Sequence, residues 1–469
     1  MVLRVDAQDT IAAIATPYGE SGIGIVRLSG PEAKGIAERI FRPRSPRRGA
    51  ATLETHHIRY GEIVDPDAGG VIDEVLLTFM AAPKTYTRQD VVEISCHGGF
   101  WPLKRILELV LRLGAREALP GEFTKRAFLS GRIDLAQAEA ILDIIQARTD
   151  EGLRLAGEQL RGRLTREIEG LRTRLVAILI PIEAYIDFSE EDGDPPNSGD
   201  VAEALHSTLA TVVRLINAYD EGEPYRDGVR VAIVGKANAG KSSLLNRLLE
   251  RERAIVTAVP GTTTDVIEET VTLSGVLIRL MDMAGLREPR NEVEREGVRL
   301  AGERLAEAHL ILLVMDRSRP LDDEDRTIFH AVAVRRKRVV PILNKIDMPS
   351  CLAEEEVRQE TEWTAIYPVS ALTGAGIEEM KTGLVQAIVT RRIQGGGGEL
   401  IPVNLRHKRV LERAQVVLEE VSEGREREIP WDLTAIEIRR ALDILGEIAG
   451  ETTPDEVLDM IFSRFCIGK

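Results

Sequence analysis

The residues that point most clearly to chemistry form a glycine-rich segment that ends in lysine and serine. Gly235 follows the apolar stretch VAIV, and Gly240, Lys241 and Ser242 come after four further residues, ahead of a helical pattern. Glycines let backbone N–H groups turn toward phosphate oxygens, and the helix N-terminus adds its positive dipole end. Lys241 should reach the β- and γ-phosphates, and the Ser242 hydroxyl should bind Mg²⁺. The predicted nucleotide contacts in this loop are Asn238, Ala239, Gly240, Lys241, Ser242 and Ser243.

Two further motifs follow apolar strand patterns and fit a phosphate and a base. In DMAG, the Asp282 carboxylate can hold Mg²⁺ through water, and the Gly285 N–H can meet the γ-phosphate. In NKID, Asp347 can accept from guanine N1–H and from the exocyclic amine, Asn344 can serve the purine N7 side, and the stem of Lys345 can pack over the base. Because adenine lacks that pair of donors, Asp347 predicts selectivity for guanine.

The fourth motif is VSALTG, which supplies Ser370 and Ala371. Their backbone N–H groups can meet guanine O6. Any one of the four motifs could be a capped turn or a surface loop. All four occur in order and each follows a strand pattern, so together they indicate a guanine-nucleotide site.

The group that would orient the attacking water is not evident from these motifs. Where a Ras-like switch places a glutamine, this chain continues Leu286-Arg287-Glu288 after Gly285. The segment that follows is rich in carboxylates that could reach back, and the alternative is an exposed helix face. The candidates are Glu292, Glu294 and Glu296.

Two segments offer oxygen atoms for cations. Asn238 lies inside the phosphate loop, and VTAVPGTTTD supplies Thr263 for Mg²⁺ together with a run of carbonyl groups. A K⁺ ion held there would supply the positive charge that other GTPases obtain from an arginine finger. The alternative is that Asn238 only stabilises a turn, as asparagine often does.

The composition is that of an ordinary protein of several domains. The 469 residues are 29% charged and 43% hydrophobic, with a formal net charge of −15. This charge excludes a global basic field, so any nucleic-acid contact would need a local basic patch or a partner. Cys96, Cys351 and Cys466 are far apart, which argues against a disulfide framework or a zinc knuckle. With no signal-peptide pattern and no apolar run of 18 residues, we expect a cytoplasmic protein with no membrane association.

The apolar pattern divides the chain into four segments. Residues 1–119 predict an α+β domain, 120–222 a long helical block, 223–386 an α/β domain with a doubly wound, mostly parallel sheet, and 387–469 further helices. Each helical block has apolar stripes that need a partner. We therefore expect the two blocks to pack as one split helical domain, with the α/β domain inserted between them.

Two helix starts carry capping signals. Asp134 and Gln137 form one expected pair, and Thr453 with Glu456 forms another, with Pro454 at the first helical position.

The motifs and their flanking segments resemble those of a known family. GKANAGKSSLLN, PGTTTD, DMAGLRE, EVE, NKID and VSALTG are flanked by PGEFTKRAFLSGRIDLAQAEA, and the chain ends in FSRFCIGK. This set is similar to that of the MnmE/TrmE tRNA-modification GTPases over essentially the whole chain. The resemblance implies an N-terminal folate-binding domain that dimerises, a split helical domain and an inserted Ras-like P-loop GTPase domain.

The resemblance also implies roles for individual residues. It implies that Glu294 is the carboxylate that orients the attacking water and that Lys241 is the second catalytic residue. It also adds Thr257, Thr262 and Thr263 to the GTP site. The implied K⁺ ligands are Asn238, Thr257, Val259 and Thr262. The implied contacts of a reduced folate, 5-formyl- or methylene-tetrahydrofolate, are Arg27, Glu93, Arg132 and Lys469. For the folate residues the alternative is ordinary surface ion pairing.

The implied function is a K⁺-activated GTPase that turns GTP into GDP and phosphate with Mg²⁺. It would act as a homodimer and bind an FAD-dependent MnmG/GidA-type partner in a heterotetramer or larger assembly. Together the two proteins would add a (carboxymethyl)aminomethyl group to C5 of the wobble uridine in tRNA. The added carbon would come from the folate. Two alternatives are a GTPase of the ribosome-assembly type and a stand-alone one-carbon transferase that carries a G domain.

Several residues depart from the family pattern. Ala237 replaces a common proline, Met283 a threonine and Thr264 an arginine, and Arg88-Gln89 replaces Gly-Glu. The changes in the switch segments leave the turnover rate open.

The C-terminal sequence FCIGK is a further candidate site. Gly468 and Lys469 do not fit a prenylation box. The tail follows a predicted capped, amphipathic helix, so we expect it to be ordered. Cys466 is then either a reactive thiol beside the one-carbon chemistry or a buried, apolar-like cysteine.

Overall fold

The structure, a computed structural model, describes most of the chain and divides it into two compact units. It describes residues 9–44, 53–188, 195–252, 269–282, 305, 307–333, 338–361, 363, 365–393, 400–427 and 429–469. The first unit comprises Met1–Leu142, Gln159–Asn197 and Glu423–Lys469, and the second comprises Asp143–Glu158 and Ser198–Ser422. The three predicted domain boundaries stay predictions.

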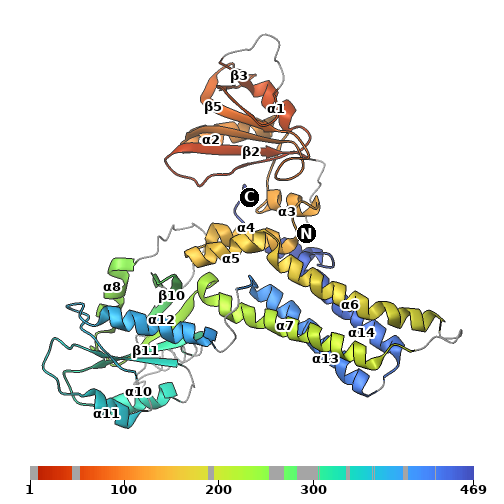
Figure 1. Cartoon of the computed structure of the whole chain (residues 1–469). Helices are drawn as coiled ribbons and strands as arrows, with labels where there is room; N and C mark the ends of the chain where they lie inside the picture. Colours follow the sequence, from red (N-terminus) through yellow and green to blue (C-terminus); the bar gives the residue numbers. More distant parts are fainter. Residues whose placement is uncertain are drawn as a thin grey trace, which may run out of the picture. The chain divides into compact units, whose positions relative to one another are not determined.

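The first unit contains a seven-stranded sheet in the order β3-β4-β5-β6-β2-β1-β7 (Figure 1). All neighbouring strands are antiparallel except β1 and β7, which are parallel. The strands are β1 (Ile11–Ile14), β2 (Ser21–Ser29), β3 (Phe41–Pro43), β4 (His57–Val64), β5 (Val71–Met80), β6 (Val91–Gly98) and β7 (Arg116–Glu117).

The two faces of this sheet have different partners. Helices α1 (Ala33–Ile40) and α2 (Phe100–Arg112) belong to an apolar cluster with the inward residues of β2 and β6, among them Leu28 and Ile94. On the other face, Phe123 of α3 (Glu122–Leu129) packs in a small cluster with Ile11 and Ala13. Because side chains alternate along a strand, Arg27 and Glu93 point to this second face.

Helices from the two helical blocks pack together inside the first unit. Helix α6 (Arg163–Phe188) lies against α14 (Trp431–Ala449), and Arg439 forms an ion pair with Glu183 at 2.6 Å. Helix α15 (Asp455–Phe462) contacts α3, and its Lys125–Asp459 ion pair measures 2.6 Å. Segments more than 250 residues apart therefore share one core.

One predicted helix start is confirmed and the other is wrong. At the start of α4 (Leu135–Gln146), the backbone N–H of Asp134 donates to Gln137 Oε1 at 2.9 Å, and that of Gln137 donates to Asp134 Oδ1 at 2.7 Å. At α15 the N-cap is Pro454, with no side-chain capping bond. The Thr453 hydroxyl instead donates to the carbonyl of Glu447 at 3.0 Å, which satisfies the last turn of α14.

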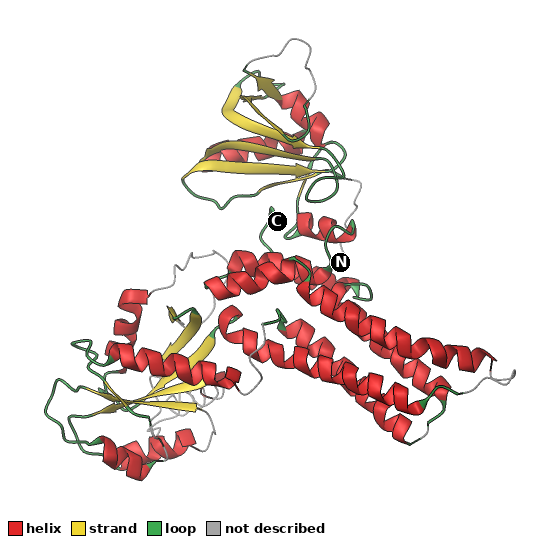
Figure 2. Cartoon of the chain, in the orientation of Figure 1, coloured by secondary structure: helices red, strands yellow, loops and turns green. Residues whose placement is uncertain are grey.

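The second unit contains a six-stranded sheet in the order β13-β12-β11-β8-β10-β9 (Figure 2). Only β9 runs antiparallel to its neighbour. The strands are β8 (Val229–Val234), β9 (Glu269–Leu273), β10 (Val276–Asp282), β11 (Leu310–Asp316), β12 (Arg338–Asn344) and β13 (Tyr367–Pro368).

Helices cover both faces of this sheet. Val231 and Ile233 of β8 pack in one cluster with residues of α8 (Lys241–Glu252) and α12 (Ile377–Ile393). Ala232 and Val234 of the same strand pack in another with α10 (Asp323–Ala333) and α11 (Glu354–Glu360). A mostly parallel sheet with both faces buried by helices is typical of a doubly wound fold. The predicted fold class is confirmed.

Three further helices belong wholly or largely to the second unit. They are α5 (Asp150–Leu160), α7 (Ser198–Arg226) and α13 (Leu405–Glu426). Lys408 of α13 pairs with Asp220 of α7 at 2.9 Å. Across the described part of the chain, no helix is both long and apolar enough to cross a bilayer.

Candidate functional site

The phosphate loop has the backbone that the glycine pattern predicts. Gly235 (φ 152°) and Gly240 (φ 95°) both adopt positive φ, and a side chain at Gly235 would meet the carbonyl oxygen of Val314 at 2.2 Å. The Lys241 ammonium donates to the carbonyls of Gly235 and Lys236, each at 2.8 Å. The lysine thus lies inside the turn of the loop, at the start of α8, where it can reach phosphate oxygens.

Asn344 connects the phosphate loop to the loop of the VSALTG motif. Its Nδ2 donates to the carbonyl of Ala239 at 2.8 Å, and its Oδ1 accepts from the N–H of Ala371 at 3.0 Å. The side chain is buried, and a Cβ on Gly240 would lie 2.1 Å from Nδ2. The Nδ2 amide has two N–H groups and one of them holds Ala239, so the second can still serve purine N7, and that role stays a prediction beside the structural one.

The base-recognition loops are fixed by their own side chains. The Ser370 hydroxyl donates to Asp347 Oδ1 at 2.5 Å, which orients an otherwise exposed carboxylate. Lys345 (φ 69°) pairs with the buried Asp316 at 2.6 Å. Burial alone would raise the pKa of Asp316, but the Lys345 and Ser318 hydrogen bonds outweigh it and the pKa is lowered.

The two N–H groups predicted to meet guanine O6 have protein acceptors. The Ser370 N–H donates to the carbonyl of Ala375 at 2.9 Å, and the Ala371 N–H donates to Asn344. Binding of O6 through these groups would require one of these bonds to be exchanged.

Lys236 is a residue of the phosphate loop that the sequence reading did not single out. It is 4% exposed, and its ammonium is bound by Asp322 and by Asp325 (3.1 Å), with Glu324 at 3.7 Å. Burial would lower the pKa of Lys236, but the hydrogen bonds that it donates to Asp322 and Asp325 raise it, so the lysine stays charged. The DDED sequence (322–325) at the start of α10 was the signal that could have revealed this ion-pair cluster.

Asn238 lies at the exposed tip of the phosphate loop with φ 64°. Asparagine tolerates this left-handed conformation better than most residues, so the backbone by itself accounts for its type. The remaining K⁺, Mg²⁺ and catalytic candidates lie outside the described residues, as does the side chain of Asp282; they are Thr257, Val259, Thr262, Thr263, Gly285 and Glu294.

A second group of candidates lies together on the sheet of the first unit. Arg27 and Glu93 are direct cross-strand neighbours on β2 and β6, and Arg27 Nη2 lies 2.7 Å from Glu93 Oε1. Arg27 also donates to the carbonyl of Gly468 at 3.2 Å. Burial and the nearby Arg27 lower the pKa of Lys469, while Glu93 opposes this shift. Three of the four predicted folate residues therefore meet within one chain.

Tyr86 links the fourth residue, Arg132, to this group. The Arg132 guanidinium lies 4.8 Å from the centre of the Tyr86 ring, a cation–π distance, and the Tyr86 hydroxyl bonds with Thr124 at 2.9 Å. Burial raises the pKa of Tyr86, and both Arg132 and Arg27 are close enough to oppose that rise. Tyr86 was missed by the sequence reading, because an isolated tyrosine carries no motif.

The C-terminal tail is ordered and docks on the first strand. Gly468 has φ 95°, and a Cβ there would meet the carbonyl oxygen of Ile14 at 2.5 Å. Phe465 is buried, and the carbonyl of Cys466 accepts from Lys469 at 3.3 Å. The Cys466 thiol is exposed, so the interpretation of a buried, apolar-like cysteine is wrong. The tail turns its glycine inward and its cysteine outward.

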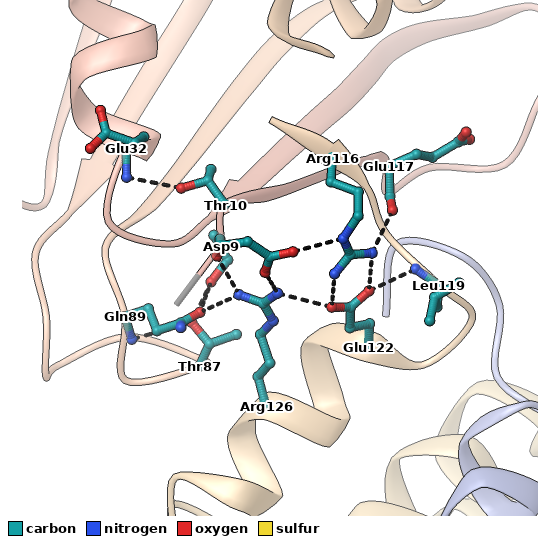
Figure 3. A network of polar contacts seen from close by, with 11 residues as sticks. Asp9, Thr10, Glu32, Thr87, Gln89, Arg116, Glu117, Leu119, Glu122 and Arg126 are labelled. Atoms are coloured by element: carbon teal, nitrogen blue, oxygen red, sulfur yellow. Dashed lines mark hydrogen bonds and ion pairs between the residues drawn. The ribbon is translucent and has the colours of Figure 1, made fainter. Parts of the chain in front are cut away.

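A buried polar network supports the α3 side of this site (Figure 3). Arg126 and Glu122 are almost fully buried and lie 2.9 Å apart, and Arg116 pairs with the same Glu122 at 2.6 Å. Asp9 bonds with both arginines, and Gln89 accepts from Arg126 at 3.1 Å. The network ties Asp9, two residues before β1, to helix α3, which carries Phe123 and Thr124.

Comparisons with known proteins cover nearly the whole chain. The family description "GTP-binding protein TrmE N-terminus" matches residues 10–132, and "MnmE helical domain" matches residues 135–466. The tRNA modification GTPase MnmE of Geobacter sulfurreducens is 46% identical over 462 residues, covering 98% of this chain and 99% of that protein. The MnmE of Chloroflexus aurantiacus is 48% identical over 461 residues, covering 98% of this chain and 100% of that protein.

A solved structure of Aquifex aeolicus Era bound to GDP.AlF4⁻ is 28% identical, covers 41% of this chain and 66% of that one, and has a TM-score of 0.30. The predicted family and the predicted enzyme class, a P-loop GTP hydrolase, are confirmed: the chain belongs to the MnmE family of tRNA modification GTPases.

Proposed function

We propose that this chain hydrolyses GTP to drive modification of C5 of the wobble uridine in tRNA, with a reduced folate as the carbon source. It acts in the cytoplasm as a homodimer, with an FAD-dependent partner of the MnmG/GidA type. The observation that carries the proposal is that one chain holds both a guanine-nucleotide site and the cluster of Arg27, Glu93, Arg132 and Lys469. The relatives that this chain matches over nearly their full length are named tRNA modification GTPases.

The nucleotide part of the proposal rests on the arrangement around α8. The loop that starts at Gly235 presents backbone N–H groups and Lys241 to phosphates, and Ser242 stands at the first turn of the helix for Mg²⁺. Asp347, oriented by Ser370, supplies the acceptor for the guanine N1–H edge. The ordered linkage from Ala239 through Asn344 to Ala371 holds the phosphate and base ends of the site at a fixed separation.

We further propose that K⁺ activates hydrolysis through Asn238, Thr257, Val259 and Thr262, with Glu294 orienting the attacking water. The position of Asn238 at the tip of the phosphate loop supports this, since its side-chain oxygen can face an ion beside the phosphates. GTP turnover should rise strongly in K⁺ compared with Na⁺. Equal rates in the two salts would contradict the K⁺ site. The left-handed backbone conformation at residue 238 would then be sufficient to explain why asparagine stands there.

The residues on the sheet fit a reduced folate. Glu93 offers a carboxylate to pterin N–H and amino donors, and Arg27, Arg132 and Lys469 offer cations to the glutamate tail. The partly exposed Tyr86 ring lies beside Arg132 and can cover a flat heterocycle, whereas the Phe123 ring beside Arg27 is buried in the core. When bound, the folate would supply the one-carbon unit. The exposed thiol of Cys466 lies three residues before Lys469, where it can act on that unit.

The homodimer is supported by an apolar stretch on the open face of the same sheet. Tyr60 and Leu76 are cross-strand neighbours and are 50% and 44% exposed, and Ile58, on the same face of β4, is 69% exposed. Exposed apolar side chains in neighbouring strands favour burial by another copy of the sheet. Replacing both Tyr60 and Leu76 with serine should shift the chain to monomer in sedimentation experiments, whereas unchanged mass would move the interface elsewhere.

The central test is mass spectrometry of tRNA nucleosides from a strain that lacks this chain. Loss of the C5 modification of wobble uridine is expected, with return on re-expression. An unchanged wobble-uridine profile would contradict the proposal and favour the ribosome-assembly alternative. Folate turnover by the isolated chain without a flavoprotein would favour the stand-alone transferase.

A further inference from the structure

Three aromatic rings stand exposed at one end of the sheet in the first unit. Tyr18, in the connection between β1 and β2, is 68% exposed, and Phe100 and Trp101, at the start of α2, are 52% and 66% exposed. The Tyr18 and Phe100 ring centres are 6.3 Å apart, and those of Phe100 and Trp101 are 5.6 Å apart. We call these three residues the aromatic platform.

The backbone explains how the platform forms. Ser21 pairs with Gly98 where β2 begins and β6 ends, which brings the two connections side by side. A Cβ on Gly98 would lie 2.0 Å from Ser21 Oγ, so only glycine permits this approach. Gly99 is then the N-cap of α2, and the two aromatic residues occupy the first turn.

Positive charge surrounds the platform. The Lys104 ammonium lies 5.7 Å from the centre of the Phe100 ring and 5.3 Å from that of the Trp101 ring. Arg105, next in the chain, is exposed, and Glu108 lies 3.8 Å from Lys104. The first turn of α2 contains no acidic residue. Pro102 has no N–H and the Leu103 N–H donates to the carbonyl of Gly99 at 3.4 Å, so the N–H groups of Phe100 and Trp101 are the ones that can donate to a ligand. The site thus combines ring faces with donors suited to a phosphate.

We propose that the aromatic platform with Lys104 binds unpaired nucleobases of RNA, the rings stacking on the bases while Lys104 and the start of α2 meet the flanking phosphates. Exposed rings combined with cations are the pattern by which proteins hold single-stranded RNA. The inference rests on the proposed action on tRNA, whose loops present unpaired bases.

The charges favour RNA over a protein surface. An apolar protein partner would have to strip water from Lys104 and Arg105, whereas RNA phosphates pair with them. The rings meet at 45° and 76°, so they do not form a parallel stacked pair, and each of the three residues keeps at least half of its surface exposed. The platform also lies at the α2 end, while Arg27 and Glu93 point to the opposite face of the sheet.

The test measures binding of fluorescein-labelled RNA to the full-length chain by anisotropy at low salt. The probes are an unmodified tRNA transcript, a single-stranded 10-mer and a duplex of equal length. Trp101→Ala and Phe100→Ala should each weaken binding of the single strand and of tRNA on the order of tenfold, since base stacking on a ring is worth that much. Binding of the duplex should change little, and so should basal GTP hydrolysis.

Conservative variants separate stacking from simple apolar contact and guard against misfolding. Trp101→Phe keeps a ring and should bind within about threefold of the unchanged chain, whereas Trp101→Leu keeps apolar area and should behave like alanine. Ile180→Ala removes an equally exposed side chain (63%) on α6 and should have no effect.

Unchanged RNA affinity in the alanine variants would overturn the inference. So would a Trp101→Leu variant that binds RNA normally, which would assign the platform to a protein partner or a second copy. If the unchanged chain binds none of the probes, the platform proposal fails, while the proposed tRNA function is still judged separately by the nucleoside profile of the deletion strain.

Discussion

Arg27 and Glu93 lie directly opposite each other on neighbouring antiparallel strands, and the same Arg27 guanidinium reaches the carbonyl of Gly468, 441 residues away in the sequence. One arginine thus joins the sheet of the N-terminal region to the end of the chain. A strand-to-strand ion pair of this kind is an ordinary structural feature, but its connection to the tail is what makes it a candidate site.

Glu93→Gln tests the pair as a ligand site. The change keeps size but removes the charge that would accept from a pterin, so affinity for 5-formyl-tetrahydrofolate should fall by about tenfold or more, as expected for a lost charge-assisted hydrogen bond. Isothermal titration calorimetry measures it. Glu74→Gln, on exposed β5, is the matched control. Equal affinity in both variants would assign the Arg27–Glu93 pair to stability alone.

Gly468→Ala should displace the tail. The new methyl group would meet the Ile14 carbonyl at 2.5 Å, and the residue holds φ 95°. We expect folate affinity to fall by an order of magnitude through misplaced Lys469, with GTP hydrolysis unchanged. Ile467→Ala, which trims an exposed neighbour, should leave both unchanged. A Gly468→Ala variant that binds folate normally would remove the tail from the site.

Gly240→Ala should abolish nucleotide binding by a defined collision. The added Cβ would lie 2.1 Å from Asn344 Nδ2 and would break its bond to Ala239. Combining it with Asn344→Ala should recover only part of the lost GDP affinity, because the positive φ at residue 240 remains strained. Fluorescent GDP titration measures both variants. Full recovery in the double variant would show that the collision alone matters.

The Lys236 cluster should contribute to stability more than to specificity. Lys236→Met leaves Asp325, which is 7% exposed, with the more distant Arg319 (3.9 Å) in place of the closer ammonium, so the free energy of unfolding should fall by about 1–3 kcal/mol. Adding Asp325→Asn should restore part of this loss, which a double-mutant cycle in urea would detect. Additive effects of the two changes would indicate that the ion pair has no net coupling.

The buried network of Figure 3 predicts a loss of stability in acid. Burial alone would raise the pKa of Glu122, but hydrogen bonds from Arg116, Leu119 N–H and Arg126 lower it below 4.5, and the pKa of Asp9 is lowered by the same two arginines against burial. This contribution is complete above the unfolded pKa and disappears as pH falls through the lowered folded pKa. Melting temperature should therefore drop steeply below about pH 4.5.

Glu122→Gln should remove part of that acid dependence and lower stability at neutral pH by about 3–5 kcal/mol, because it breaks a buried ion pair. Melting curves from pH 3 to 7 compare the two chains. A variant with the same pH slope as the unchanged chain would place the acid sensitivity elsewhere.

The local signals in the sequence identified most of the elements. Short apolar stretches in the sequence coincide with β1, β2, β5 and β6, and apolar stretches that run into glycine, aspartate or asparagine coincide with β8 and β10 to β12. The strands β3, β7 and β13 have only two or three residues, and β4 and β9 are interrupted by polar residues and depend on pairing with β5 and β10, so no comparable signal marks these five in the sequence. The predicted cap by Thr453 was wrong because its hydroxyl donates to the carbonyl of Glu447 in the preceding helix α14.

The sequence by itself determined the nucleotide site, because the spacing of Gly235, Gly240, Lys241 and Ser242 encodes a backbone shape that needs only adjacent residues. Tertiary structure alone decided that Asn344 bridges two loops, that Lys236 is neutralised by α10, and that Tyr86 stands beside Arg132. It also decided that Gly468 faces Ile14 while Cys466 faces solvent. These relationships depend on sheet register and on the docking of distant segments, which arise from the packing of the whole core and not from any local pattern.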